Sequence, residues 1–173
     1  MNEEPSVSDA LPPASLPLSL EGREGGGEGG SSRYKRPESV LVVGYTAAGD
    51  VLVLRRRQPP DFWQSVTGSL RWDETDPLDA ARRELYEETG LGDGVEVIAC
   101  GAVNRFPILP PWRHRYAPDV MENVEHVFRV LLPERRTVAH NPAEHGEYEW
   151  LARAAAAARV SSWTNRDAIL CLP

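Results

Sequence analysis

The sequence predicts an α+β fold in which a mixed β-sheet is covered by helices on both faces. β-rich segments recur from residue 39 to residue 151, interrupted by a single helical segment. An Ala-rich, helical C-terminal region follows the last of these segments. A sheet must bury its apolar faces against other elements, so one central helix and one terminal helical region indicate an α/β/α sandwich.

The chain of 173 residues, 41% of them hydrophobic, is long enough for one compact domain with its own core. Residues 1–33 are dominated by Pro, Ser, Gly and Glu, and this composition buries too little apolar surface to offset its chain entropy. We therefore expect a disordered N-terminal extension over residues 1–33 and a single folded domain over residues 34–173.

Three extended segments open the predicted domain. SVLVVGYT (39–46) and VLVLRRR (51–57) are rich in β-forming residues and are joined by the turn AAGD, so they predict a β-hairpin. FWQSVTGSL (62–70) predicts a third strand that ends near Gly68.

A helix is predicted directly after this strand. Asp76 can cap its N-terminus and Pro77 suits the first helical position. Gly90 predicts its C-terminal end. The side of the helix that faces the core carries Leu78, Ala81 and Leu85.

The second half of the chain completes the sheet. Strands are predicted at VEVIACGAV (95–103), ENVEHVFRVLL (122–132) and GEYEWL (146–151), and a Pro-, Arg- and aromatic-rich loop is predicted over residues 104–120. An Ala-rich helix and a last helix around residues 165–170 are expected to close the chain.

Charge and composition exclude several classes of function. The net charge is −7, and residues 34–173 contain 20 acidic and 17 basic residues. A chain without basic excess is a poor candidate for binding duplex nucleic acid or an anionic membrane. Cys100 and Cys171 are too few for a disulfide framework or a zinc site. With no apolar run of about 20 residues and an acidic N-terminus, we expect a cytoplasmic protein.

The segment RRELYEETGL (82–91) places Glu84, Glu87 and Glu88 on one helical face near the negative end of the helix dipole. Neutralisation by Arg82 and Arg83, on a solvated acidic face, is one interpretation. The other is a divalent cation: Mg²⁺ binds carboxylate oxygens, keeps several waters and bridges to substrate phosphates.

The segment GSLRWDETDPLDAARRELYEETGL (68–91) resembles the Nudix box. The second half of the pattern matches in full, from Arg83 to Leu91, and Gly68 and Glu74 match the first half. Eight residues separate Glu74 from Arg83, where the family has seven. An extra residue inside the helix would rotate its two parts by about 100° relative to one another, so we place it in the preceding loop, around residues 75–76.

The resemblance extends over residues 34–170 to the bacterial dihydroneopterin triphosphate diphosphatases, a Nudix subfamily of folate biosynthesis. It is carried by YKRPESVLVVGY, PDFWQSVTGSL, RHRYAP, AEHGEYEW and SSWTNRDAI. It implies removal of pyrophosphate from 7,8-dihydroneopterin triphosphate with Mg²⁺, or Mn²⁺ as a substitute. The substrate-binding positions that it implies are Lys35, Arg56, Thr67, Phe106, Pro107, Ile108, Leu109, His145 and Ser162.

The same resemblance implies a metal and catalytic set. Glu84 and Glu88 are the first metal ligands, with the Gly68 carbonyl as an additional one, and Arg83 and Glu87 belong to the catalytic set. Glu144 would be a further ligand and the favoured general base. Glu125 and a box glutamate remain alternative bases.

Independently of the resemblance, basic and aromatic side chains suit a phosphorylated heterocycle. Arginine binds phosphate oxygens in bidentate fashion, and aromatic rings stack on flat heterocycles. Each base could equally be a surface residue, and most of the aromatics core or loop anchors. The resemblance implies a small-molecule pterin or nucleoside triphosphate as the partner; no oligomeric state is predicted. Two alternatives stay open, namely a broader (d)NTP pyrophosphohydrolase and a Nudix module that binds its ligand without hydrolysis. The bases noted are Lys35, Arg56, Arg113 and Arg115; the aromatics are Phe62, Trp63, Phe106, Trp112, Tyr116 and Trp163.

Overall fold

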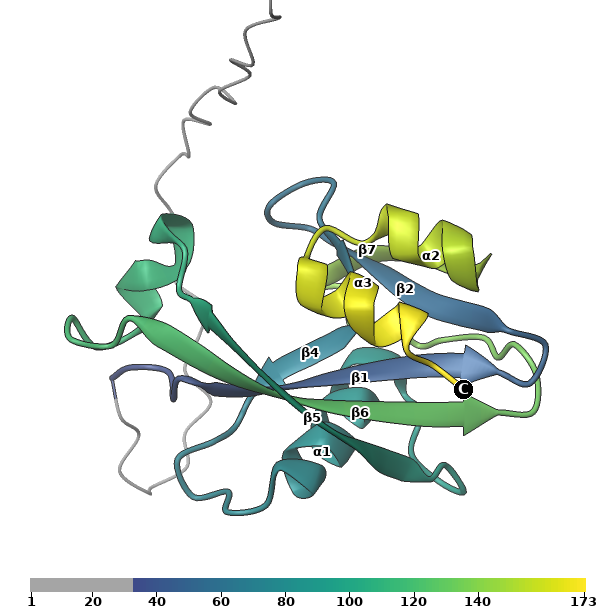
Figure 1. The fold of residues 1–173 in the computed structure, drawn as a ribbon, viewed down its shortest axis with the longest axis horizontal. Coiled ribbons are helices and arrows are strands. Elements are labelled where there is room, and N and C mark those ends of the chain that lie inside the picture. Colours follow the sequence, from purple (N-terminus) through teal and green to yellow (C-terminus); the bar gives the residue numbers. More distant parts are fainter. Residues whose placement is uncertain (1–32) are drawn as a thin grey trace, which may run out of the picture. The chain divides into compact units, whose positions relative to one another are not determined.

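The structure, a computed structural model, describes residues 33–173. The predicted disordered extension, residues 1–33, lies outside the described residues except for Arg33. The described residues form a seven-stranded mixed sheet with helices on its two faces, which confirms the predicted fold class (Figure 1). None of their helices is long and apolar enough to span a bilayer.

Strand β1 (Glu38–Thr46) lies at the centre of the sheet and pairs on one side with β6 (Glu122–Leu132). This pairing is parallel along the whole of β1, whereas β5 (Val97–Pro107) adds to the far side of β6 in antiparallel orientation. The parallel pair makes the sheet mixed.

The other side of β1 is shared by two strands. β4 (Val66–Ser69) pairs with residues 39–42 of β1, and β2 (Asp50–Arg56) pairs with it only at the predicted hairpin turn. β2 then diverges to pair with β3 (Trp63–Gln64) and β7 (His145–Ala152).

The predicted strand over residues 62–70 is therefore two strands, and the single-strand prediction was wrong. The chain leaves β2 after Gln64 and joins β1 at Val66. Ser65 lies at this crossing, and its N–H donates a hydrogen bond to Asn165 Oδ1 at 2.6 Å. The break brings Thr67 and Gly68 of β4 next to Glu84 and Glu88 in the second half of the glutamate-rich helix.

Helix α1 (Pro77–Thr89) has the predicted ends. Asp76 Oδ1 accepts a hydrogen bond from the Leu78 N–H at 2.9 Å. Gly90 adopts a left-handed φ of 71°, and its N–H donates to the Tyr86 carbonyl. The helix therefore runs without interruption past Arg83 and the three glutamates, so the additional residue of the box lies outside it.

The two faces of the sheet carry separate apolar cores. Even-numbered residues of β1, such as Val40 and Val42, pack with the buried side of α1. The odd-numbered Leu41 and Val43 pack with α2 (Arg153–Arg159) and α3 (Trp163–Leu170). The alternation of strand side chains thus produces the three layers that Figure 1 shows, with α1 below the sheet and α2 and α3 above it.

The predicted loop over residues 104–120 is partly regular. β5 continues to Pro107, opposite Glu122, and a 3-10 helix covers Pro110–Arg115. β5 is irregular between Ala99 and Val103, where Gly101 has a left-handed φ of 70°. The longer strand brings residues 106–109 to the edge of a cavity described below.

Candidate active site

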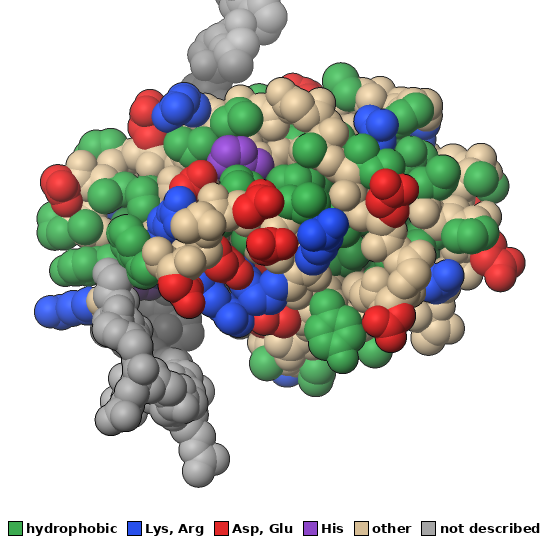
Figure 2. Space-filling view, turned by 90° about the horizontal axis from the view of Figure 1, so that it is seen from below, with side chains coloured by type: hydrophobic (Ala, Val, Ile, Leu, Met, Phe, Trp, Pro, Cys, Tyr) green, Lys and Arg blue, Asp and Glu red, His purple; other side chains and the backbone are tan. Residues whose placement is uncertain are grey.

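The three helix glutamates do not share one environment. Glu88 is only 2% exposed and Glu84 is largely buried, whereas Glu87 lies on the exposed side of α1. The spacing therefore brings Glu84 and Glu88 together at the sheet and turns Glu87 towards solvent. Figure 2, which views the α1 side, shows acidic and basic side chains interleaved at the centre of this face.

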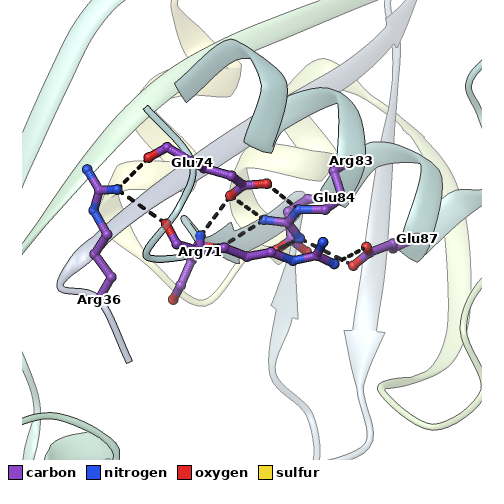
Figure 3. Close-up of polar contacts among 7 residues, drawn as sticks. Arg36, Arg71, Glu74, Arg83, Glu84 and Glu87 are labelled. Carbon is purple, nitrogen blue, oxygen red and sulfur yellow. Dashed lines mark hydrogen bonds and ion pairs between the residues drawn. The ribbon is translucent and has the colours of Figure 1, made fainter. Parts of the chain in front are cut away.

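Arg83 binds the acidic side chains around it (Figure 3). Its guanidinium makes a bidentate contact with Glu74, at 2.6 and 2.9 Å, and contacts Glu84 Oε1 at 2.6 Å and Glu87 Oε2 at 3.3 Å. Its hydrogen bonds hold the pKa of Glu74 below its ordinary value. Arg83 thus supplies part of the neutralisation predicted for the acidic face, while Arg82 lies beside Asp79 at 3.5 Å.

The loop before α1 is bound to this network. The Arg71 N–H donates to Glu74 Oε2 at 2.7 Å, and the Arg71 guanidinium contacts Glu87 at 2.9 Å. Arg36 donates to the carbonyls of Arg71 and Glu74, at 3.2 and 2.6 Å (Figure 3). Glu74 therefore orients Arg83 despite the additional residue in the loop.

Neutralisation is incomplete for the two buried carboxylates. Burial raises the pKa of Glu84 to about 7, although Arg83 opposes the shift. Burial also raises the pKa of Glu88, whose Oε1 atom is buried and has no hydrogen-bond partner in the described part of the chain. A buried carboxylate oxygen without a partner is costly, so the site suits an additional positive charge.

Glu144 and His145 approach the same point from the start of β7. Ligand atoms of Glu88, Glu144 and His145 all lie within 4.8 Å of one another, with His145 Nε2 at 3.3 Å from Glu88 Oε2. Glu144 is exposed and His145 is buried.

Gly68 completes the group at the end of β4. A Cβ atom at this position would lie 1.8–2.3 Å from the carboxyl atoms of Glu84, so only glycine lets the backbone and this carboxylate approach so closely. Carboxylate and carbonyl oxygens are the ligands that hard divalent cations prefer. Glu88 and Glu144 therefore fit a divalent metal ion, together with His145, whose ligand atoms lie within the same 4.8 Å. Glu84 and Gly68 lie outside this group but against each other, one helical turn from Glu88, and offer further oxygens.

A cavity of about 420 Å³ opens next to Gly68, on the sheet face that carries α3. The structure brings to its wall eight of the nine predicted substrate-binding residues, namely Lys35, Arg56, Thr67, Phe106, Pro107, Ile108, Leu109 and Ser162. The ninth, His145, lines a second, polar cavity of about 530 Å³, which shares Arg56 with the first. The volume of the first cavity is that of a small-molecule site.

Aromatic rings surround this first cavity. Phe62 and Trp112 meet edge to face, with ring centroids 6.0 Å apart, and Phe106, Tyr116 and Trp163 also line the wall. Trp63 is instead buried in the core, with the Arg159 guanidinium 4.9 Å from the centre of its ring. Flat rings at the wall of a cavity suit a flat heterocycle.

Three basic residues, Lys35, Arg56 and Arg115, converge on the cavity wall. Lys35 as a whole is exposed, but burial of its ammonium group, together with nearby Arg115, lowers its pKa to about 8. Burial also lowers the pKa of Arg115. Among residues 33–173, none of the three forms an ion pair with a carboxylate. They are thus available to an anion. Arg113 instead donates to loop carbonyls of Val120 and Pro118.

Sequence reasoning missed several polar residues of the cavity. Gln64, Asn123 and Asn165 are each at most 4% exposed and line its wall, and the alternative base Glu125 lies beside them rather than with Glu88 and Glu144. The alternation of side chains in ENVEHV could have identified two of them. Asn123 and Glu125 lie on the same face of the strand as Val127, which is part of the core.

Comparison with known proteins identifies the family. The NUDIX domain profile matches residues 35–170. The chain belongs to the Nudix family. The match spans all of the structural elements described above, from β1 to the end of α3, and confirms the resemblance of residues 68–91 to the Nudix box.

Related Nudix proteins point to one subfamily. The chain is 46% identical over 140 residues to the dihydroneopterin triphosphate diphosphatase of Escherichia coli, covering 79% of this chain and 91% of the relative. The Haemophilus influenzae protein of the same name is 38% identical over 141 residues, with 79% and 87% covered. The solved structure of the E. coli dihydroneopterin triphosphate pyrophosphohydrolase superposes with a TM-score of 0.74, covering 80% of this chain and 95% of that one.

Proposed function

We propose that this Nudix protein hydrolyses 7,8-dihydroneopterin triphosphate to dihydroneopterin monophosphate and pyrophosphate, with Mg²⁺ as cofactor and Mn²⁺ as a substitute. The observation that carries the proposal is the two-part site. An aromatic cavity adjoins the buried box carboxylates, and basic side chains without carboxylate partners lie at its wall. The named activity of the relatives, one of them 46% identical, supports the same substrate.

The metal would be held by Glu84, Glu88, Glu144 and the Gly68 carbonyl. When bound, Mg²⁺ offsets phosphate charge, aligns the scissile bond and lowers the pKa of water. Arg83 positions Glu84 through its 2.6 Å contact and is itself fixed by Glu74. Glu87, which contacts both Arg83 and Arg71, orients this arginine pair from the exposed side.

Lys35, Arg56 and Arg115 would bind the triphosphate where the cavity meets the metal residues. Electrostatic interactions of Lys35 with both Glu84 and Glu144 support this placement. Thr67, which precedes Gly68 and lines the cavity, offers a hydroxyl to a phosphate oxygen. The 3-10 segment and residues 106–109, with Ser162 at the start of α3, would contact the pterin side.

We assign the general base to Glu144. It is exposed and lies near Glu88, so it can reach a water that the buried helix carboxylates cannot. Replacing Glu144 by Gln should lower kcat by about 100-fold or more, with a smaller loss of Mg²⁺ binding. Glu134→Gln, at an exposed site near the other end of the same loop, is the control. Turnover near that of the wild type would remove Glu144 as the base.

The competing activity is a broader (d)NTP pyrophosphohydrolase, because the same cavity could accept a purine. Pyrophosphate release should be measured side by side on dihydroneopterin triphosphate and the four common dNTPs, with Mg²⁺ present. Our proposal predicts the highest kcat/KM for dihydroneopterin triphosphate. A higher value for any dNTP would support the broader activity, and release from none would indicate a ligand-binding module.

We propose that the protein acts in the cytoplasm. Cys100 and Cys171 are both free and exposed, as expected where thiols stay reduced.

A further inference from the structure

The floor of the aromatic cavity carries a buried carboxylate that the proposed chemistry leaves unused. Glu125 lies on β6, on the sheet face that carries α3, and is only 5% exposed. It is absent from the group formed by Glu88, Glu144 and His145. Burial of a carboxylate lowers the stability of the fold unless the charge is paired or hydrogen-bonded. The position of Glu125 therefore suggests that it binds a ligand.

The partners of Glu125 are neutral. Asn104 Nδ2, on β5, donates to Glu125 Oε2 at 3.2 Å, and the Thr164 hydroxyl donates a second hydrogen bond. No basic residue of the described chain forms an ion pair with it. A carboxylate can accept about four hydrogen bonds, so about two positions remain for a ligand in the cavity. Burial raises the pKa of Glu125, as expected for a carboxylate without a basic partner.

Asn123 adds a second acceptor on the same strand face. Its side chain is 4% exposed, and its Nδ2 donates to Ser39 Oγ at 2.7 Å, which turns Oδ1 away from that partner. Asn123 Oδ1 is buried and has no hydrogen-bond partner among residues 33–173. This strand face therefore has unused acceptor capacity at the Glu125 carboxylate and at the buried Asn123 Oδ1. The two oxygens of a carboxylate suit a ligand with adjacent N–H donors.

We propose that Glu125 is a specificity-determining residue, which accepts hydrogen bonds from the 2-amino group and the adjacent ring N–H of a 2-amino-4-oxopyrimidine ring. This ring is present in pterins and in guanine. Adenine presents an amino donor beside a ring acceptor, and that acceptor would face the carboxylate. The inference rests on the proposed function, whose substrate class it explains.

The aromatic wall is consistent with this orientation. Phe62, Trp112 and Phe106 line the same cavity as Glu125, so a flat ring whose donor edge faces the floor can contact their side chains. Lys35 and Arg56 line the wall beside Gly68, so the phosphates attached to that ring can extend towards the helix carboxylates. Glu125 therefore acts on binding, and no proton transfer is assigned to it.

The test compares Glu125→Gln with Glu122→Gln, a substitution on the exposed start of the same strand. Gln keeps the size of the side chain and one acceptor but presents an NH₂ group to the donor edge. KM for dihydroneopterin triphosphate should rise by roughly 10- to 100-fold in the first variant, with kcat within about threefold of the wild type. The control should match the wild type. An unchanged KM, or a large loss of kcat at constant KM, would overturn the proposal.

A second measurement uses the wild-type protein and needs no hydrolysis. Binding of 6-hydroxymethylpterin is compared with that of the corresponding lumazine, in which a carbonyl replaces the 2-amino group. The pterin should bind at least about tenfold more tightly, because the lumazine carbonyl would face the carboxylate. Equal affinity would overturn the proposal, including when Glu125→Gln fails to fold.

These outcomes separate the inference from the proposed function. If the wild type releases no pyrophosphate from dihydroneopterin triphosphate, the proposed function is wrong, while the pterin-to-lumazine ratio still decides the role of Glu125. If hydrolysis proceeds and the ratio is one, the function stands and the inference fails.

Discussion

Replacing Gly68 by Ala tests the metal site without removing a carboxylate. The added Cβ would lie 1.8 Å from the carboxyl carbon of Glu84, whereas ordinary contact begins near 3.4 Å, so this group must move by about 1.6 Å. It cannot move independently, because Arg83 holds it at 2.6 Å and is itself fixed by two contacts to Glu74. Since a misplacement of about 1 Å can cost ~100-fold in rate, we expect kcat to fall by about that factor or more.

The assay is pyrophosphate release as a function of Mg²⁺ concentration. Gly44→Ala is the matched control, because its added Cβ would lie 3.7 Å from the nearest atom, on Leu52, which is ordinary contact. The Gly68 variant should need more Mg²⁺ and turn over slowly, whereas the control should resemble the wild type. If Gly68→Ala keeps kcat within threefold and the same Mg²⁺ midpoint, Glu84 is not a metal ligand in this position.

Four further predictions concern the carboxylate network and the helix that carries it. Arg83→Met leaves Glu74 and Glu84 largely buried without their partner, so urea titration should show the free energy of unfolding reduced by about 3 kcal/mol; a change below about 0.5 kcal/mol would contradict it. Because the folded-state pKa of Glu84 is raised to about 7, Mg²⁺ must displace a proton below that pH, and calorimetry should find binding about tenfold weaker at pH 6 than at pH 8. The same raised pKa makes the stability of the metal-free protein depend on pH. The contribution of Glu84 to the free energy of unfolding is fully present below about pH 4.5 and is lost as the pH rises to about 7. Glu84→Gln should therefore flatten the pH dependence of the melting temperature between these two values. Asp76→Ala removes the side chain that caps α1, so the same urea titration should show the free energy of unfolding reduced by about 1 kcal/mol. An unchanged free energy of unfolding would mean that the Asp76 side chain does not stabilise the helix.

Local sequence was sufficient to predict the bounds of a helix or strand when residues at its own ends determine where it starts and stops. α1 begins after Asp76 and ends at Gly90 as predicted, because capping depends on contacts within one turn. The strand over residues 122–132 was predicted end to end. The break at Ser65 was not predictable, because it reflects how β2 and β4 divide the edge of β1, which is a tertiary property.

The site was predicted only in part for a similar reason. The helical spacing of Glu84 and Glu88 placed them together, and eight of the nine substrate positions implied by the resemblance line the cavity. The bidentate contact of Arg83 with Glu74 depends on the path of a loop with one additional residue. The acceptor floor depends on β5, which brings Asn104 from 21 residues away to Glu125.

The central claim is that Glu84 and Glu88 stay together at the sheet because a divalent cation binds between them and Glu144. Titration of the protein with Mn²⁺, followed by electron paramagnetic resonance, measures this binding directly. The wild type should bind Mn²⁺, and Glu88→Gln should bind it at least about tenfold more weakly. Wild-type protein that leaves all of the Mn²⁺ free, or that binds it as tightly without the Glu88 carboxylate, would contradict the claim.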